Sequence, residues 1–486
     1  MSAAAHRLWR ALCALVVRVF YRRFEVDGRE HLPAEGPVLL CANHVNALVD
    51  AVVVQAACDR PVHPLARSGL FRSPVLRPFL ALQGAVPVAR RHPGRDAASV
   101  RTANAAAFEK VHARLAAGGV LLIFPEGQSH SDPHLRPIKT GAARLVLGAH
   151  QRGIDPPIVP VGLTFPRKGT FRGSVLVRFG PPIESARFAP IAPAPASAAG
   201  DDGPAVPAPA DASAARQVKR LTRAIQRGLA GVTLELDDWL DLQLARQVRA
   251  FLDELEDRRH PAPLAQRFDE LRRIVEAYHG LRLTQPDKAA ILREKLRRFS
   301  ELRATHRVRD DHLSLRRRRW TLQLVARTLL HLTVGLPLTL WGWLNAAVPF
   351  AITRALSRRS ARGRDQYDTA GILIGAPVFA GAWFVQTAAV AWLAWGRTDA
   401  PVRIALLYVL SVLIAAAVAL GLGPARVRLR QDLAVTLRFL RRRRLRSYLL
   451  EKRRELMVEV AALVRRVRAT TGEPTPTAPS ALDRPA

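Results

Sequence analysis

The sequence predicts an α/β domain with a mostly parallel sheet, followed by an α-helical region and then by membrane helices near the C-terminus. Two observations support this fold class. Between residues 30 and 185, short β-rich runs alternate with stretches of helical character, as they do around a parallel sheet. After residue 320, three apolar segments are each long enough to reach through the hydrocarbon of a bilayer.

The short β-rich runs predict the strands of the α/β domain. Helices are expected between them at 94–117 and 138–153. The expected strands are 37–42, 62–66, 84–89, 118–124, 156–165 and 174–180.

Composition favours a membrane as partner. A formal net charge of +34 and a pI near 11.6 leave two broad partners, nucleic acid or an anionic membrane surface. The chain lacks the basic patches interleaved with aromatic residues that base stacking uses, so we expect no nucleic acid. The apolar segments indicate a lipid bilayer with anionic lipids. The three cysteines form no CxxC pair, so neither a disulfide framework nor a zinc site is expected.

Shifts in composition divide the chain into successive parts. Residues 1–24 mix arginines with an apolar run too short to span a bilayer, which predicts an interfacial helix. Residues 189–214 are rich in proline and alanine and cannot pack a core, so they are expected to form a linker. The other parts are the α/β domain (25–188), a charged helical region (215–319), a membrane region (320–423), and a basic helix with a disordered tail (424–486).

The arginines around the apolar segments predict a topology. They are frequent both before and directly after segment 321–353, so three full crossings would conflict with the positive-inside rule. Gly335-Leu336-Pro337 divides this segment into halves of about sixteen residues, short of the roughly twenty that a crossing needs. We therefore predict a re-entrant or interfacial hairpin at 321–353 and spans at 370–395 and 404–423. The α/β domain and the C-terminus would both be cytoplasmic.

The stretch NHVNALVD, residues 43–50, places a histidine and an aspartate after an expected strand. Because residues 47–57 can begin a helix, His44 would lie in a strand-to-helix loop and Asp50 in the first helical turn. A carboxylate paired to one imidazole nitrogen fixes the tautomer and frees the other nitrogen as a base. We predict that His44 is a general base oriented by Asp50. A capping or surface pair is the alternative for this stretch alone.

Two further stretches end at the same edge of the expected sheet. GGVLLIFPEGQSHSD, residues 118–132, runs a buried strand into Pro-Glu-Gly, which places Glu126 and backbone amides at the usual ligand crevice. A common turn is the simpler interpretation of that motif. The strand at 84–89 leads into Arg90 and Arg91, whose guanidinium groups can grip a phosphate bidentately.

Together these motifs resemble the glycerolipid acyltransferase superfamily, the lysophosphatidate acyltransferase-like enzymes. The resemblance covers about residues 25–185 and rests on Asn43-His44 with Asp50, Gly84 to Arg90, FPEGQS at 124–129 and IVPV at 158–161. Most of the family has four residues between the His and the Asp, whereas this chain has five. The longer spacing is similar to that of the yeast-type glycerol-3-phosphate/dihydroxyacetone-phosphate acyltransferases, which also carry membrane segments after the catalytic domain.

The resemblance implies acyl transfer from acyl-CoA or acyl carrier protein, as co-substrate, to a hydroxyl of glycerol 3-phosphate or dihydroxyacetone phosphate. No metal and no further cofactor are implied. Lysophosphatidate as acceptor is an alternative, and an inactive membrane scaffold of the same fold is another. The expected setting is a bacterial inner membrane with the catalytic domain in the cytoplasm. The implied catalytic residues are His44 and Asp50, and the implied substrate-binding residues are Asn43, Arg90, Glu126 and Gly127.

Overall fold

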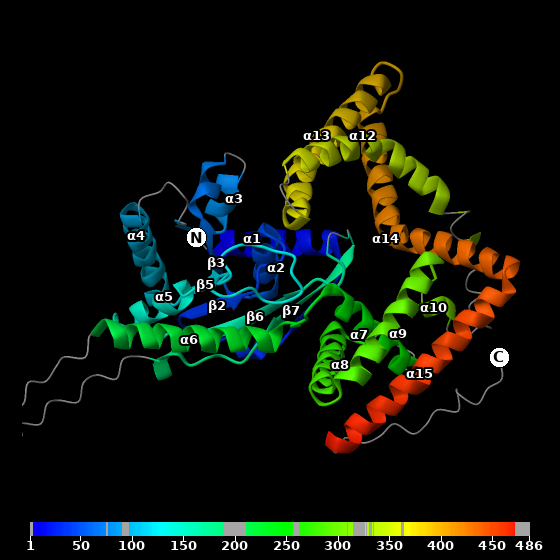
Figure 1. Ribbon diagram of the computed structural model, residues 1–486. Helices are drawn as coiled ribbons and strands as arrows, with labels where there is room; N and C mark the ends of the chain where they lie inside the picture. Colours follow the sequence, from blue (N-terminus) through cyan, green and yellow to red (C-terminus); the bar gives the residue numbers. More distant parts are fainter. Residues whose placement is uncertain are drawn as a thin grey trace, which may run out of the picture. The chain divides into compact units, whose positions relative to one another are not determined.

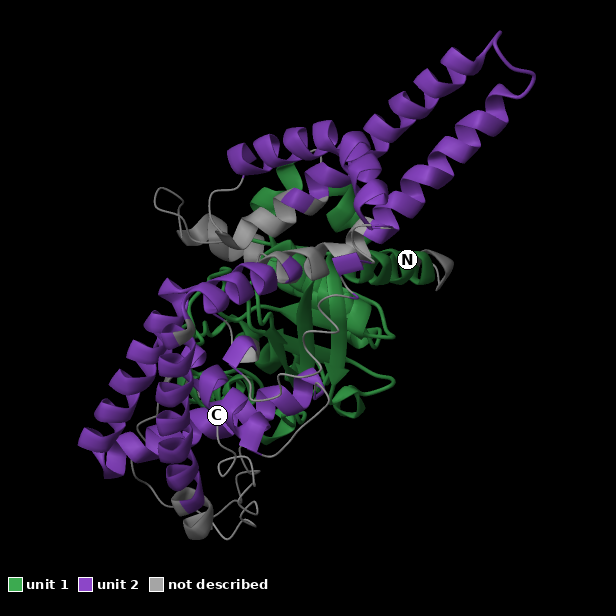
Figure 2. Ribbon diagram, turned by 90° about the vertical axis from the view of Figure 1, so that its right-hand side faces the viewer, with its two compact units in different colours: residues 1–235, 362–369 green, residues 236–361, 370–486 purple. Residues whose placement is uncertain are grey.

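The chain folds into two compact units, residues 1–235 with 362–369 and residues 236–361 with 370–486 (Figure 2). The structure is a computed structural model. It describes residues 3–73, 76–89, 97–168, 170, 172–188, 210–255, 262–308, 310–313, 326, 328–329, 333, 335–360 and 364–471.

The first unit is built on a seven-stranded sheet with the order β1-β7-β6-β2-β5-β3-β4 (Figure 1). Strands β6, β2, β5, β3 and β4 run parallel, β7 runs antiparallel to β6, and β1 runs parallel to β7. The sheet is therefore mostly parallel, as predicted. Its strands are β1 (Tyr21–Asp27), β2 (Val38–Ala42), β3 (Val62–Arg67), β4 (Val86–Val88), β5 (Val120–Ile123), β6 (Ile158–Thr164) and β7 (Gly173–Phe179).

The strands β2 to β7 correspond to the expected β-rich runs, whereas β1 was not expected. The N-terminal helix α1 (Ala3–Phe20) ends four residues before the predicted boundary at 24. Strand β1 follows it directly and pairs with β7 at the edge of the sheet. The arginines at 22 and 23 continue the basic pattern of the helix, which is why the change to a strand is hidden in the sequence.

Helices cover both faces of the sheet. Leu39 of β2 and Leu121 of β5 lie in one core cluster with α4 (Ala97–Ala116), α5 (Gly141–His150) and α6 (Ala210–Val232). Side chains alternate along a strand, so Leu40 and Leu122 face the opposite side, and they too are fully buried. On that side α2 (Leu48–Ala57) packs against α1. The remaining short elements are α3 (Leu76–Leu82), η1 (Arg29–His31), η2 (Ser68–Arg72) and η3 (Ser185–Phe188).

Helix α6 corrects the predicted domain boundaries. The sequence placed the end of the α/β domain at 188 and the end of the linker at 214, but α6 begins at Ala210. The spacing of Leu221, Ile225 and Leu229 puts them on one face of α6, and all three lie in the core cluster of the sheet. A Cβ built on Gly162 of β6 would approach the Val232 carbonyl oxygen to 2.0 Å, so helix and strand backbones touch there. The compact unit therefore extends to residue 235.

The second unit is built from helices. Phe251 of α7, Phe299 of α9 and Leu449 of α15 are among the residues of its buried core. Its helices are α7 (Trp239–Leu255), α8 (Leu264–Thr284), α9 (Pro286–Thr305), α10 (Asp310–Leu313), α12 (Leu336–Ser360), α13 (Arg364–Ala394), α14 (Pro401–Arg441) and α15 (Arg443–Thr471).

Three helical segments, Leu336–Ser360, Leu373–Ala394 and Pro401–Val418, are long and apolar enough to cross a membrane. The second and third correspond to the two predicted spans. The first differs from the predicted hairpin, because α12 is a helix of 25 residues rather than an arm of about sixteen. Pro337 is the second residue of α12. Most of 321–335 lies outside the described residues, and the hairpin itself stays a prediction.

Polar side chains join these apolar helices. The Tyr408 hydroxyl lies 2.5 Å from Oδ1 of Asn345 and 3.2 Å from Oε1 of Gln386. The Gln386 side-chain amide donates to the Asn345 carbonyl oxygen at 2.9 Å. Trp341 Nε1 donates to Oγ of Ser411 at 3.1 Å. Hydrogen bonds of this kind hold apolar helices together where the hydrophobic effect gives no preference for association.

Candidate active site

The two sequence motifs meet at the carboxyl end of the parallel strands. Strands β2 and β5 are parallel neighbours, so the loops that follow them leave the sheet at the same edge. His44 lies in the loop after β2, and Glu126 lies in the loop after β5. The backbone N–H of His130 donates to the His44 carbonyl oxygen at 3.0 Å and joins the two loops.

His44 and Asp50 form the pair that the sequence predicted. Asp50 lies in the first turn of α2, and its Oδ2 is 2.9 Å from Nδ1 of His44. The chain turns back between them at Ala47, which has φ 48° and ψ −127°. Residues with a Cβ rarely adopt a positive φ, so the longer His–Asp spacing is closed here by a strained turn.

The hydrogen bonds around Asp50 define which imidazole nitrogen is free. The backbone N–H groups of Val45 and Asn46 also donate to Oδ2 of Asp50, at 2.9 and 2.7 Å. Because Oδ2 is the common acceptor, Nδ1 of His44 donates its proton to it and the lone pair is on Nε2. Nε2 has no hydrogen-bond partner among the described residues. The His44 side chain is 17% exposed and that of Asp50 is 0% exposed, so only the histidine can reach a substrate.

Phe124 fixes the plane of the imidazole. Its ring stacks on His44 with a centroid distance of 4.0 Å and an interplanar angle of 16°. Since Phe124 directly follows β5, the sheet itself sets the position of this ring. With the bond to Asp50, the stacking leaves His44 little freedom to rotate.

Glu126 was predicted to bind substrate, but the structure turns its carboxylate into the protein. Its Oε1 accepts the backbone N–H of His44 at 2.8 Å. Its Oε2 accepts the backbone N–H of Arg136 at 2.9 Å and also contacts Nε2 of His130. The side chain is buried, and both oxygens are used in joining the loops. The predicted contact of Glu126 with substrate therefore has no free oxygen in this arrangement.

Asn43 is likewise engaged inside the protein. Its side-chain Nδ2 donates to the Leu163 carbonyl oxygen at 3.1 Å, and its Oδ1 accepts the Leu163 N–H at 2.7 Å. This double hydrogen bond joins the end of β2 to β6 just before His44. The geometry assigns Asn43 to the support of the loop, where the sequence had suggested substrate binding.

The glycine of the Pro-Glu-Gly turn lies beside a lysine. Gly127 has φ +77°, and a Cβ built on it would come within 2.7 Å of Nζ of Lys139. The positive φ explains the glycine. Lys139 has no ion-pair partner among the residues that the structure describes.

Sequence reasoning found the pair at the centre of the site but not all of its surroundings. It missed Lys139, and the only available signal was its place fifteen residues after a strand that ends in the crevice. It also missed His130, whose distance of four residues from Glu126 was a usable signal. Arg90 and Arg91 lie outside the described residues, so the predicted guanidinium contact stays a prediction.

Comparison with known proteins identifies the kind of domain in which these residues lie. Residues 23–164 match the family model described as Acyltransferase. The chain is 28% identical over 208 residues to glycerol-3-phosphate O-acyltransferase 1 of Saccharomyces cerevisiae, covering 42% of this chain and 25% of that protein. It is also 28% identical over 178 residues to a 1-acyl-sn-glycerol-3-phosphate acyltransferase of Limnanthes alba, covering 35% of this chain and 58% of the plant protein. The chain thus spans a quarter to somewhat over half of the length of these relatives.

A solved structure is also similar in part. It is the 1-acyl-sn-glycerophosphate acyltransferase PlsC from Thermotoga maritima, with 17% identity and a TM-score of 0.32 over 46% of this chain and 78% of that chain. The parallel sheet, the loops at its carboxyl edge and the family match define an acyltransferase domain at residues 23–164. The named relatives of this domain are glycerol-3-phosphate and 1-acylglycerol-3-phosphate acyltransferases, in agreement with the resemblance that the motifs carry.

Proposed function

We propose that the protein transfers a fatty acyl group from an acyl thioester, acyl-CoA or acyl carrier protein, to a hydroxyl of glycerol 3-phosphate or dihydroxyacetone phosphate. The observation that carries the proposal is the His44 Nδ1–Asp50 Oδ2 hydrogen bond of 2.9 Å, with Nε2 left as a free base. In phospholipid synthesis such a reaction would add an acyl chain to the glycerol backbone.

The chemistry follows from the free nitrogen of His44. Nε2 removes the proton of the acceptor hydroxyl as its oxygen attacks the thioester carbonyl carbon. The carbon–oxygen bond forms, the carbon–sulfur bond breaks, and the imidazolium returns the proton to the leaving thiolate. Asp50 stabilises the imidazolium through Nδ1. General-base catalysis contributes about 10² to 10⁴-fold, and orientation of the reactants contributes much of the remainder.

The acceptor is assigned from the His–Asp spacing. Five residues separate His44 from Asp50. This spacing resembles that of the yeast-type enzymes, and the resemblance implies glycerol 3-phosphate as the acceptor. The yeast relative named glycerol-3-phosphate O-acyltransferase supports this choice. Lysophosphatidate is the second candidate, because the Limnanthes relative is named for that acceptor. The intact pair with a free Nε2 argues against an inactive scaffold.

Cationic side chains would hold the acceptor phosphate. Lys139 lies beside Gly127 at the carboxyl edge of the sheet and has no ion-pair partner among the described residues. Arg90, two positions after the end of β4 in the sequence, is the second candidate. Glu126 and Asn43 would act on His44 through the loops, as positioning residues.

The protein would work at an anionic bilayer. Trp9 and Cys13 bury one face of α1 in the first unit, while the opposite face is apolar and exposed, with arginines beside it. This arrangement suits a helix that lies in the membrane interface. The candidate spans in α13 and α14 would anchor the chain, with the acyltransferase domain on the cytoplasmic side of a bacterial inner membrane. The exposed apolar side chains of α1 are Leu8, Leu12, Leu15 and Val19.

The test is an assay of the purified full-length protein with radiolabelled acyl-CoA or acyl carrier protein and three acceptors. We expect product with glycerol 3-phosphate, less with dihydroxyacetone phosphate, and least with lysophosphatidate. His44→Ala should lower the turnover by a factor of at least about 10². Asp50→Asn should lose most of it too, because a neutral amide cannot stabilise the imidazolium that forms on His44 as the Asp50 carboxylate does.

The controls separate chemistry from folding. Thermal unfolding of His44→Ala should match that of the unchanged protein, since the substitution removes a partly exposed ring and little core volume. Activity of His44→Ala above about a tenth of normal would rule out the general-base role. If the protein prefers lysophosphatidate, the general-base mechanism still holds but the proposed acceptor is wrong.

A further inference from the structure

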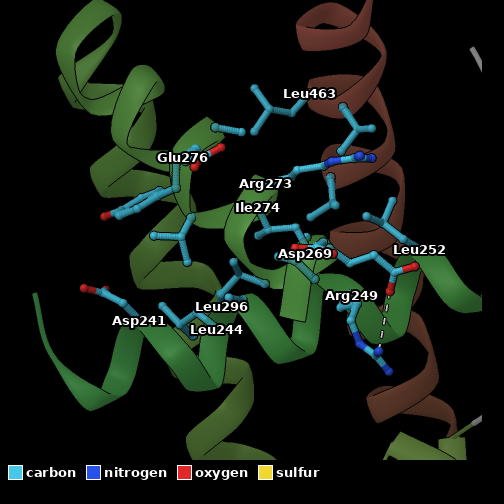
Figure 3. A pocket seen from close by; sticks show the side chains of 18 of the residues that line it. Asp241, Leu244, Arg249, Leu252, Asp269, Arg273, Ile274, Glu276, Leu296 and Leu463 are labelled. Atoms are coloured by element: carbon cyan, nitrogen blue, oxygen red, sulfur yellow. Dashed lines mark ion pairs between the residues drawn. The ribbon is translucent and has the colours of Figure 1, made fainter. Parts of the chain in front are cut away.

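The second unit holds a cavity that acyl transfer at His44 does not use. It lies among α7, α8, α9 and α15 and has a volume of about 850 Å³ (Figure 3). Small-molecule sites in proteins are typically about 300 to 1,000 Å³. The lining contains no histidine, serine or cysteine among the described residues, so the cavity is suited to binding rather than to acyl transfer.

The walls of the cavity are apolar over most of their length. Leu244, Val248 and Leu252 follow one another at intervals of four residues along one face of α7. Ile274 of α8 and Leu296 of α9 face the same space (Figure 3). An apolar space of this volume has room for an apolar ligand.

The charged side chains of the lining have partners, with one exception among the described residues. Arg293 pairs with Asp241 at 3.1 Å, and Arg249 pairs with Asp253 at 2.9 Å and Glu270 at 3.5 Å. Glu276 pairs with Arg272 at 3.5 Å, and Asp269 also has an interaction partner.

Arg273 differs from these groups. It is exposed, and it has no ion-pair partner among the residues that the structure describes. Figure 3 shows its side chain among those that line the cavity. The lining carries five carboxylates and three arginines, and each carboxylate already has a partner, so Arg273 is the charged side chain of the lining that remains available to a ligand. An apolar space with one available guanidinium fits a molecule that has a long apolar body and an anionic end.

We propose that this cavity binds a single-chain anionic lipid, with the acyl chain among the leucines of α7 and the head group at Arg273. A guanidinium group can hold either a carboxylate or a phosphate with two parallel hydrogen bonds. A fatty acid and a lysophospholipid share this chemistry. The site is separate from the proposed acyl transfer and does not depend on it.

The first experiment locates the lipid. The full-length protein in nanodiscs is exposed to a photoreactive palmitate, and labelled peptides are identified by mass spectrometry. Labels are expected in residues 241–296 and 460–464, at a level that unlabelled palmitate competes away. Labelling of these peptides no higher than that of the nanodisc-facing apolar helices would overturn the proposal.

The second experiment measures affinity across ligands. From ten to sixteen carbons, each added methylene should strengthen binding about fourfold, which corresponds to about 0.8 kcal/mol. Hexadecanol, which has the chain without the charge, should bind at least tenfold more weakly than palmitate. The ratio of palmitate to lysophosphatidate affinity assigns the head group as carboxylate or phosphate. Absence of any dependence on chain length would contradict an acyl-chain site.

Matched variants test the cavity itself. Ala277→Trp fills the cavity and should weaken palmitate binding at least tenfold, whereas Ala290→Trp on the exposed side of α9 should not. Arg273→Gln should lower palmitate affinity to that of hexadecanol and leave hexadecanol unchanged. Arg298→Gln, whose side chain is 74% exposed outside the cavity, is its control.

The outcomes are separable from the acyl-transfer assay. If Ala277→Trp fails to fold by circular dichroism, the exposed Arg273→Gln decides the question alone. Equal palmitate affinity for Arg273→Gln and the unchanged protein would refute the head-group site. Loss of transfer in His44→Ala with normal palmitate binding would show that the two sites are independent.

Discussion

The backbone N–H of His44 donates to Oε1 of Glu126 at 2.8 Å, although 82 positions separate the two residues in the chain. The same carboxylate accepts the Arg136 N–H through its other oxygen. The Glu126 carboxylate of the Pro-Glu-Gly motif therefore holds the backbone of His44 in place. The position of the His44 loop depends on this motif.

This relationship changes what a Glu126 substitution should do. Glu126→Gln offers one oxygen where two are used, so a buried N–H group loses its acceptor and the His44 loop shifts. A misplacement of about 1 Å can cost about 10²-fold, and we expect kcat to fall by that order while the acceptor KM changes little. Steady-state kinetics measure both, with exposed Gln128→Ala as the control. A raised KM with an unchanged kcat would mean that Glu126 contributes to substrate binding rather than to the position of His44.

Lys139 should affect the acceptor rather than the chemistry. Lys139→Gln removes a cation beside Gly127, and we expect the KM for glycerol 3-phosphate to rise about tenfold, as for the loss of one charge-assisted contact. Lys139→Arg should keep most of the affinity. Lys110→Gln, another exposed lysine, is the control. An unchanged KM for Lys139→Gln would mean that Lys139 does not bind the acceptor phosphate, and Arg90 would be the remaining candidate.

Helix α1 should enter the membrane interface with its exposed apolar face. A polarity-sensitive dye attached at Leu15→Cys should shift to shorter wavelength when the protein is placed in anionic bilayers, and one at Gln151→Cys should not. The native cysteines can remain, because burial raises the thiol pKa of Cys13 and Cys58 to about 12 and also raises that of Cys41. Equal spectra at both positions would mean that α1 stays in water.

The topology prediction is tested with exposed positions on either side of the candidate spans. In intact cells, an impermeant thiol reagent should label Thr398→Cys and should not label Ser360→Cys. Both should react after permeabilisation, which checks that each thiol is accessible. The length of α12 makes the test decisive, because a helix of 25 residues can cross. Labelling at Ser360→Cys would show that it does cross.

Local features of this fold were predictable from the sequence, and long-range ones were not. His44 and Asp50 are close in the chain, so one loop and one helical turn fix their pairing. The direction of the Glu126 carboxylate depends instead on a partner 82 positions away, and no local pattern distinguishes a side chain that faces the crevice from one that faces His44.

The same reason explains the missed domain boundary. The apolar stripe of α6 fits a helical bundle as well as a sheet, and its partner is identified by contacts in the folded chain, such as that of Val232 with Gly162.

The docking of α6 across the Pro/Ala-rich segment has a practical consequence for dissecting the protein. A fragment that stops at residue 188 would leave the face of the sheet around Leu39 and Ile158 without its covering helix and prone to aggregation. A fragment that continues to Glu235 would keep that face closed, with the Glu235 carboxylate accepting the Leu135 N–H at 3.2 Å. Because the contact is noncovalent, a protease cut between residues 188 and 210 need not separate the pieces. A synthetic peptide of α6 supplied in trans could restore the shorter fragment by complementation.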